Sequence, residues 1–89
     1  MKAVISVVGR DTVGIIAKVS AECASCGVNI LDISQSVLDS YFTMIMITDI
    51  DNITVPFAEF VDRMSSLGME QHLDIHTMHE DIFNAMHSI

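Results

Sequence analysis

The fold is decided by the stretch VVGRDTVGIIAKV (residues 7–19), where one pattern of apolar residues gives way to another. Residues 2–8 (KAVISVV) are apolar and rich in β-branched side chains, as in a buried strand. From Ile15 the apolar residues recur at helical spacing instead. The stretch therefore predicts a strand, a glycine-containing turn and a helix, in that order.

The predicted helix buries one face and ends at a glycine. Gly27 follows its last apolar residue, and glycine suits the left-handed conformation in which many helices stop. The expected buried face consists of Ile16, Val19, Cys23 and Cys26.

A hairpin follows the first helix. Residues 29–38 alternate between apolar and polar, and residues 41–48 return as a second strand after a two-residue turn. A loop of that length pairs Val37 with Phe42. This apolar pair marks the side of the hairpin that faces the core.

The last third of the sequence predicts a helix, a strand and a short second helix. Thr54 can cap the first of these helices, and Gly68 ends it. Residues 70–76 then alternate as a strand. Thr77 and Glu80 have the spacing of a capping box, which would open the short helix.

This order predicts an α+β fold of the ferredoxin-like type, βαββαβ, with a four-stranded antiparallel sheet and a short C-terminal helix. Right-handed crossovers place the first and third strands at the centre and both main helices on one face. The expected division is a domain over residues 1–77 and a helix over residues 78–89, packed on that domain or extending it.

The opposite face of the predicted sheet is expected to be uncovered and apolar. Its central positions hold Val4, Val8, Ile45 and Ile47. The whole chain is 51% apolar, with a mean hydropathy of +0.48, which is more apolar surface than one small core can hide. We therefore expect a homodimer or a higher oligomer.

Charge and composition argue against several partners. The net charge is −8, and the four basic residues are scattered, so nothing favours nucleic acid or an anionic membrane surface. No apolar run approaches the roughly 20 residues that span a bilayer, and the start of the chain lacks a signal-peptide pattern. We expect a soluble protein of the cytoplasm.

The turn between the first strand and the first helix is the strongest candidate site. Free N–H groups at a helix start, together with Arg10, suit a carboxylate ligand, and Gly9 and Gly14 let it approach the backbone. The alternative is a plain turn in which Asp11 or Thr12 caps the helix.

Two other groups of residues have a functional and a structural interpretation. Cys23 and Cys26 form a CxxC pair, but at a helix C-terminus, where the dipole opposes a thiolate, so we expect core residues. His72, His76 and His79 could bind zinc or nickel, or could simply face solvent on an edge strand. No metal or cofactor is assigned, and no serine has the surroundings of a nucleophile, so we expect no enzymatic activity.

Three segments resemble one known family. VGRDTVGI (residues 8–15) resembles the opening of ACT domains, and GVNILDI (27–33) is similar to their entry into the second strand. DISQSVLDSYFTM (32–44) looks like the short stand-alone ACT proteins of bacteria and archaea. The resemblance covers essentially the whole chain.

The resemblance implies a non-catalytic regulatory module that senses a small molecule, expected to be an amino acid, at a homodimer interface. Asn29 and Ile30 of a neighbouring chain would close the ligand pocket. The loop positions that match the family's effector site are Arg10, Asp11, Thr12, Val13, Gly14 and Ile15.

Two alternatives remain at this point. One is a constitutive interaction subunit of ACT shape that binds a protein partner and no small molecule. The other is a metal-handling protein that uses His72, His76 and His79.

Overall fold

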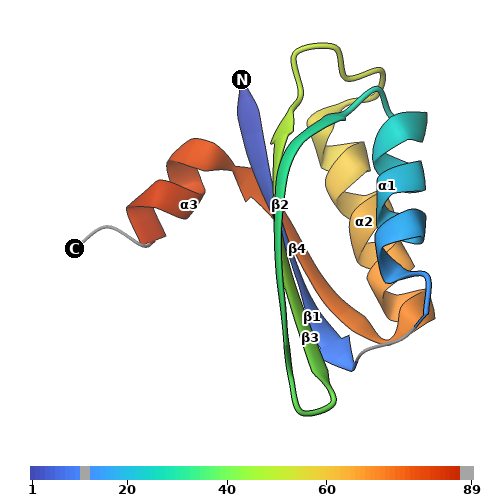
Figure 1. Cartoon of the computed structure of the whole chain (residues 1–89). Coiled ribbons are helices and arrows are strands. Elements are labelled where there is room, and N and C mark those ends of the chain that lie inside the picture. The colour runs from blue at the N-terminus through green and yellow to red at the C-terminus, as the bar shows by residue number, and fades with distance from the viewer. Residues whose placement is uncertain (11–12, 87–89) are drawn as a thin grey trace.

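Seven elements follow one another in the computed structural model, which describes residues 1–10 and 13–86 (Figure 1). Their order is βαββαβ followed by a short helix, as the sequence predicts. They are β1 (Lys2–Arg10), α1 (Ile15–Ser25), β2 (Asn29–Leu38), β3 (Tyr41–Asp49), α2 (Phe57–Gln71), β4 (Leu73–His79) and α3 (Glu80–Met86).

The four strands form one antiparallel sheet in the order β2-β3-β1-β4. The first and third strands are central, which confirms the predicted ferredoxin-like topology. α1 and α2 cover one face of the sheet, and α3 lies on the other side (Figure 1). Val37 pairs with Phe42, so the predicted register of the hairpin is also confirmed.

The core fills the space between the sheet and the two long helices. Ile5, Met44 and Met46 rise from the central strands to meet Phe60 and Met64 of α2, and all five side chains are buried. Burial of such side chains is the main force that holds the two layers together.

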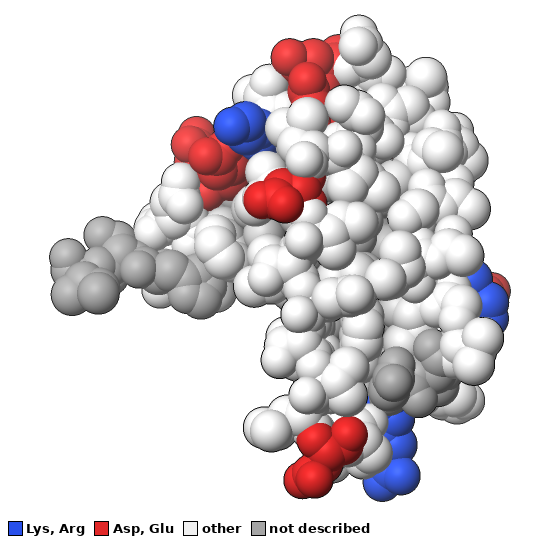
Figure 2. Space-filling model, in the orientation of Figure 1, with Lys and Arg blue, Asp and Glu red and all other residues white. Residues whose placement is uncertain are grey.

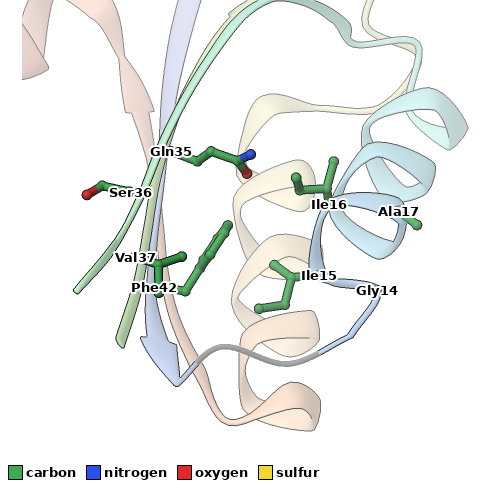
Figure 3. Close-up of a pocket in the computed structure, with 8 residues that line it drawn as sticks. All are labelled: Gly14, Ile15, Ile16, Ala17, Gln35, Ser36, Val37 and Phe42. Atoms are coloured by element: carbon green, nitrogen blue, oxygen red, sulfur yellow. The ribbon is translucent and has the colours of Figure 1, made fainter. Parts of the chain in front are cut away.

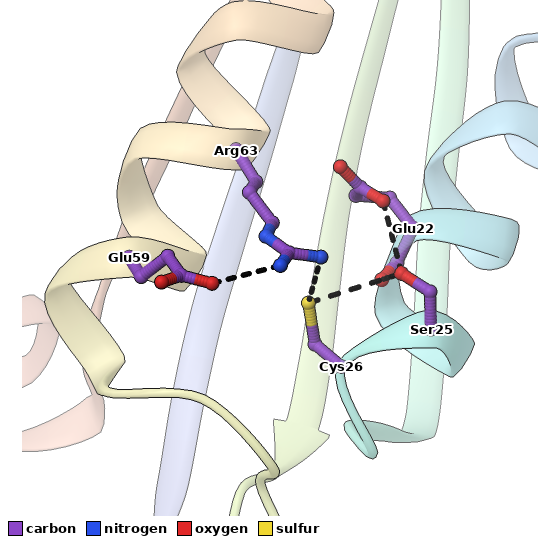
Figure 4. A network of polar contacts seen from close by, with 5 residues as sticks. All are labelled: Glu22, Ser25, Cys26, Glu59 and Arg63. Carbon is purple, nitrogen blue, oxygen red and sulfur yellow. Dashed lines mark hydrogen bonds and ion pairs between the residues drawn. The ribbon is translucent and has the colours of Figure 1, made fainter.

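Both cysteines belong to this core, as expected, and neither has any exposed surface. Burial raises the pKa of the Cys23 thiol to about 12. Cys26 lies one residue beyond α1, where its Sγ accepts a hydrogen bond of 3.6 Å from Arg63 of α2 (Figure 4). Arg63 also bonds Glu59 at 2.8 Å, so one guanidinium ties the end of α1 to α2.

The second helix differs from the prediction at both ends. It begins after Pro56, not at Thr54, and it continues through Gly68 to Gln71. A Cβ on Gly68 would lie 2.7 Å from the carbonyl oxygen of Leu73. Gly68 is therefore the place where α2 packs closely on the start of β4, and it does not end the helix.

The fourth strand begins and ends three residues later than predicted, at Leu73 and His79. Residues Ala3 and Val4 of β1 pair with His79 and Met78, so the sheet continues to the start of α3 at Glu80. The expected capping box is wrong, because Thr77 lies in the strand. Continued strand pairing supplies backbone hydrogen bonds that a helix start at residue 78 would forgo.

Candidate functional site

At the start of α1, the first backbone N–H groups have no hydrogen-bond partner among the described residues. Its first helical hydrogen bond runs from the N–H of Lys18 to the carbonyl of Gly14, at 3.0 Å. The preceding amides of the first turn therefore have no partner within the helix. Within the described residues Gly14 caps α1 without a side-chain hydrogen bond, and the first turn holds no acidic residue. The positive end of this helix dipole is therefore available to an anion.

These amides border a groove of about 470 Å³ between α1 and the β2–β3 hairpin (Figure 3). Its volume falls within the range of small-molecule sites. The lining residues are Gly14, Ile15, Ile16, Ala17, Gln35, Ser36, Val37 and Phe42.

Side chains from both layers point into the groove. Ile15 and Phe42 face each other across it, and the amide of Gln35 extends from β2 toward α1 (Figure 3). Ser36 points to the other side of the sheet. The groove thus combines an apolar floor, one neutral amide and the amides of a helix start, and no charged side chain of the described chain lines it.

The groove exists because β2 is an edge strand. It pairs with β3 alone, and α1 does not cover it fully. Val37 is on the expected side of the hairpin, yet 55% of its surface stays exposed, whereas its partner Phe42 is buried. The prediction of a core pair is therefore half right, because the pair forms the floor of an open site.

Two of the predicted loop residues, Gly14 and Ile15, line the groove. Arg10 ends β1 and Val13 is almost fully exposed; neither is among the lining residues. Asp11 and Thr12 lie outside the described residues, so the predicted capping role of either residue has no structural counterpart to report.

Asn29 and Ile30 lie at the far end of the same strand from Gln35 and Val37. They are five to eight positions away, or about 17–26 Å along an extended strand, so they cannot reach the groove of their own chain. Within one chain, the structure does not bring these two residues to the first loop.

Sequence reasoning did not assign Ile16, Ala17, Gln35, Ser36, Val37 and Phe42 to the site. The pairing of Val37 with Phe42 was the signal available, since it shows which residues of the hairpin face α1. What the sequence did not reveal is that α1 stops short of the edge strand.

Charge is sparse around the groove. Figure 2 shows charged side chains at the top and upper left, at the right-hand rim and at the lower end, with few in between. A helix start at which the described lining residues carry no charge favours a ligand whose own charges balance, such as a zwitterion.

The three histidines of the metal alternative have separate surroundings. His72 follows α2 in a left-handed conformation, His76 pairs with Asp74 at 3.0 Å, and His79 stacks on Phe57 with ring centroids 4.1 Å apart. Among residues 1–10 and 13–86, no group of three or more His, Cys, Asp or Glu side chains is placed to hold a metal ion. Within that same part of the chain, the helices are too short or too polar to cross a membrane.

The sequence profile of the ACT domain matches residues 2–77, from the first strand to the fourth. The chain belongs to the ACT domain family. A UPF0237 protein of Clostridium perfringens is 51% identical to this ACT domain over 89 residues, which is 100% of each chain.

Solved structures support the same family assignment. An ACT domain protein from Streptococcus pneumoniae superposes with a TM-score of 0.80 at 40% identity, over 93% of each chain. The regulatory subunit of aspartate kinase from Thermus thermophilus has a TM-score of 0.66 at 24% identity, over 85% of this chain and 49% of that one, and so shares the fold.

Proposed function

We propose that this ACT domain is a non-catalytic sensor of a free amino acid, which binds in the groove between α1 and β2. The observation that carries the proposal is the start of α1, whose N–H groups receive no side-chain cap from the described residues and border an apolar groove. A carboxylate suits these donors, and an aliphatic or aromatic side chain suits the floor.

The groove can accommodate each part of an amino acid. The carboxylate accepts hydrogen bonds from the first amides of α1. The side chain packs against Ile15, Val37 and Phe42. The ammonium group donates to the Oε1 of Gln35, which extends toward α1 (Figure 3). The helix dipole opposes a purely cationic ligand and the net charge of −8 opposes a purely anionic one, so a zwitterion fits best.

A second copy completes the site in this proposal. If the free edges of two β2 strands pair in antiparallel fashion, the start of one strand lies beside the end of the other. Asn29 and Ile30 of the partner subunit then lie next to Val37, at the groove. The edge is suited to pairing, because β2 is ten residues long and Asp32 is its one charged residue.

Such a site couples ligand binding to assembly. A ligand that contacts two chains binds the dimer better than the monomer, so it shifts the equilibrium toward the dimer by its differential affinity. A protein that recognises one assembly state would then respond to the amino acid. The shared fold with a regulatory subunit of aspartate kinase supports this role at the level of fold.

A thermal-unfolding screen of the full chain against the twenty amino acids tests the proposal. A true ligand at one hundred times its dissociation constant adds about 2.7 kcal/mol of stability. We expect stabilisation by one chemical class of amino acid and none by its amino-alcohol analogue, which lacks the carboxylate. Stabilisation by no amino acid would contradict the proposal and favour a constitutive interaction subunit.

The role of the partner is tested at the middle of the β2 edge. In Ile33→Lys, antiparallel pairing brings two lysines close together, and their repulsion weakens the edge contact. We expect a lower mass in equilibrium sedimentation and weaker amino-acid binding in the same variant. Full ligand affinity in a variant that no longer pairs would show that one chain suffices.

A further inference from the structure

α3 is a helix without enough of its own chain to cover it. None of its seven residues, all within the described part of the chain, is buried, and 66% of the surface of Met86 is exposed. Isolated helices shorter than about 12 residues are marginal in water, and most helical stability in proteins comes from packing an apolar face. α3 extends obliquely away from the sheet on the side opposite α1 and α2 (Figure 1). The described residues of the chain therefore cover only part of α3.

An apolar groove of about 380 Å³ lies between α3 and the open face of the sheet. Ile45, Val8 and Met78 form its floor, and Phe83 and Met86 of α3 form its wall. No carboxylate, lysine or arginine among the described residues lines it.

α3 covers only part of this face. Val4, near the end of β1 from which α3 departs, is buried, whereas 42% of Val8 and 36% of Ile45 remain exposed further along. β1 spans about 30 Å and α3 about 10 Å, from nine and seven residues respectively. The face therefore has room for a second helix of the same size.

We propose that a second copy of this chain docks on the open face, and that the α3 of each copy lies in the groove of the other. The groove and the helix occur on the same surface, which is what a two-fold symmetric contact requires. Each copy then buries the exposed part of the other's sheet, and the two α3 helices lie side by side between the sheets.

The charges on this face select the orientation of the two copies. By strand alternation Lys2 and Arg10 belong to the open face, at opposite ends of β1, and Asp74, which pairs with Val8, lies on the same face near Arg10. α3 departs from the Lys2 end, because His79 pairs with Ala3. With the two β1 strands antiparallel across the interface, the acidic start of the partner's α3 comes to lie over the Arg10 end, where the charges of Arg10 and Asp74 balance, and not over another acidic helix start.

The parallel orientation is disfavoured. It would place the two α3 helices at the same end, where Glu80 and Asp81 of one copy would face the same two residues of the other. Like charges at close range repel, and the exposed part of each sheet would stay uncovered. The antiparallel orientation satisfies both the charge and the apolar surface.

The groove of the open face shares no lining residue with the ligand groove of the proposed function. This interface rests on self-association, as that function does, but on the other face of the sheet. Two interfaces of two-fold symmetry would together give a tetramer, so each can be removed without the other.

Equilibrium sedimentation of the full chain at micromolar concentration tests the proposal. Ile45→Glu places a charge in the groove of the open face, and Ile33→Lys alters the β2 edge on the opposite, helix-covered face of the sheet. We expect Ile45→Glu to reduce the measured mass from that of the tetramer to that of a dimer. Its circular dichroism spectrum should stay unchanged. A wild-type mass for Ile45→Glu, or a monomeric wild type, would overturn the proposal; a wild-type mass for Ile33→Lys would instead overturn the edge contact of the proposed function.

A charge exchange tests the orientation in the Ile33→Lys background, without any ligand. Asp81→Arg and Arg10→Glu should each raise the dissociation constant of the face-to-face contact about fivefold, as expected for exposed pairs that are reversed. The dissociation constant of the double variant should return to within about twofold of the value for the protein without the charge exchange. Asp62→Arg on α2 is the matched control and should leave this dissociation constant unchanged. Additive weakening in the double variant would overturn the antiparallel arrangement.

Discussion

The carbonyl oxygen of Leu73 lies 2.7 Å from the point that a Cβ atom on Gly68 would occupy. An alanine in a helix interior is normally about 1 kcal/mol more favourable than a glycine. At this position the added methyl group meets backbone that cannot move without disturbing β4, so we expect Gly68→Ala to destabilise the fold by about 1–3 kcal/mol. Urea unfolding measures the change, and an increase in stability would contradict the close packing of α2 on β4.

Gly14 is constrained by its backbone conformation and not by its neighbours. Its φ is 87°, and a Cβ there would meet no other atom within 4 Å. We expect Gly14→Ala to lose about 1–2 kcal/mol of stability, the usual strain of a left-handed L-residue. Gly14→Asn should lose less, because asparagine tolerates this conformation better. Equal losses in urea unfolding would point to a steric cause instead.

These two glycines show what sequence reasoning could reach. A glycine can mark a turn, a helix end or a close contact, and residue order alone does not distinguish them. Gly14 precedes a change of period, so its turn was predictable. Gly68 follows an apolar stripe as a helix end would, and only the position of β4 reveals that the helix continues past it.

The residues of the candidate site likewise fall into those that local sequence predicts and those that only tertiary packing reveals. Gly14 and Ile15 follow from the predicted strand–turn–helix order, which is local. Gln35 and Val37 depend on how far α1 reaches toward the edge strand, which is a property of tertiary packing. The placement of α3 is of this second kind too: Thr77 and Glu80 have capping-box spacing, yet strand pairing with β1 keeps Thr77 in the sheet.

The thiol of Cys23 makes the stability of the fold depend on pH. Burial raises its pKa from an ordinary value of 9.0 to about 12. A pKa raised by folding means that the folded chain keeps the proton, so this contribution is complete below about pH 9 and is lost as the pH rises toward 12. The free energy of unfolding should fall by up to about 1.4 kcal/mol per pH unit in that window.

Comparison with Cys23→Ala isolates this contribution, because other groups also titrate above pH 9. The variant should be less stable at neutral pH, since it leaves a small cavity, but its stability should fall less steeply between pH 9 and 11. Cys26→Ala retains the Cys23 thiol and should keep most of the wild-type slope. Identical slopes in all three proteins, measured by urea unfolding, would show that Cys23 does not ionise differently on folding.

Adjacent residues of β2 offer a sharp test of the ligand site. Gln35 points into the groove and Ser36 points to the other side of the sheet (Figure 3). Gln35→Leu keeps the size of the side chain and removes the oxygen proposed to accept from the ligand's ammonium group. Hydrogen bonds to charged groups contribute about 1.5–3 kcal/mol, so affinity for the amino acid selected by the screen should fall between about 10-fold and 100-fold.

Ser36→Ala is the matched control, because Ser36 borders the groove while its side chain points to the other side of the sheet, so the substitution leaves the side chains inside the groove unchanged. Its affinity in calorimetric titration should equal that of the wild type. The des-amino analogue of the same ligand sharpens the result further: it lacks the ammonium group, so Gln35→Leu should bind it no more weakly than the wild type does. Equal losses for the amino acid and its analogue would mean that Gln35 shapes the groove without contacting the ammonium group.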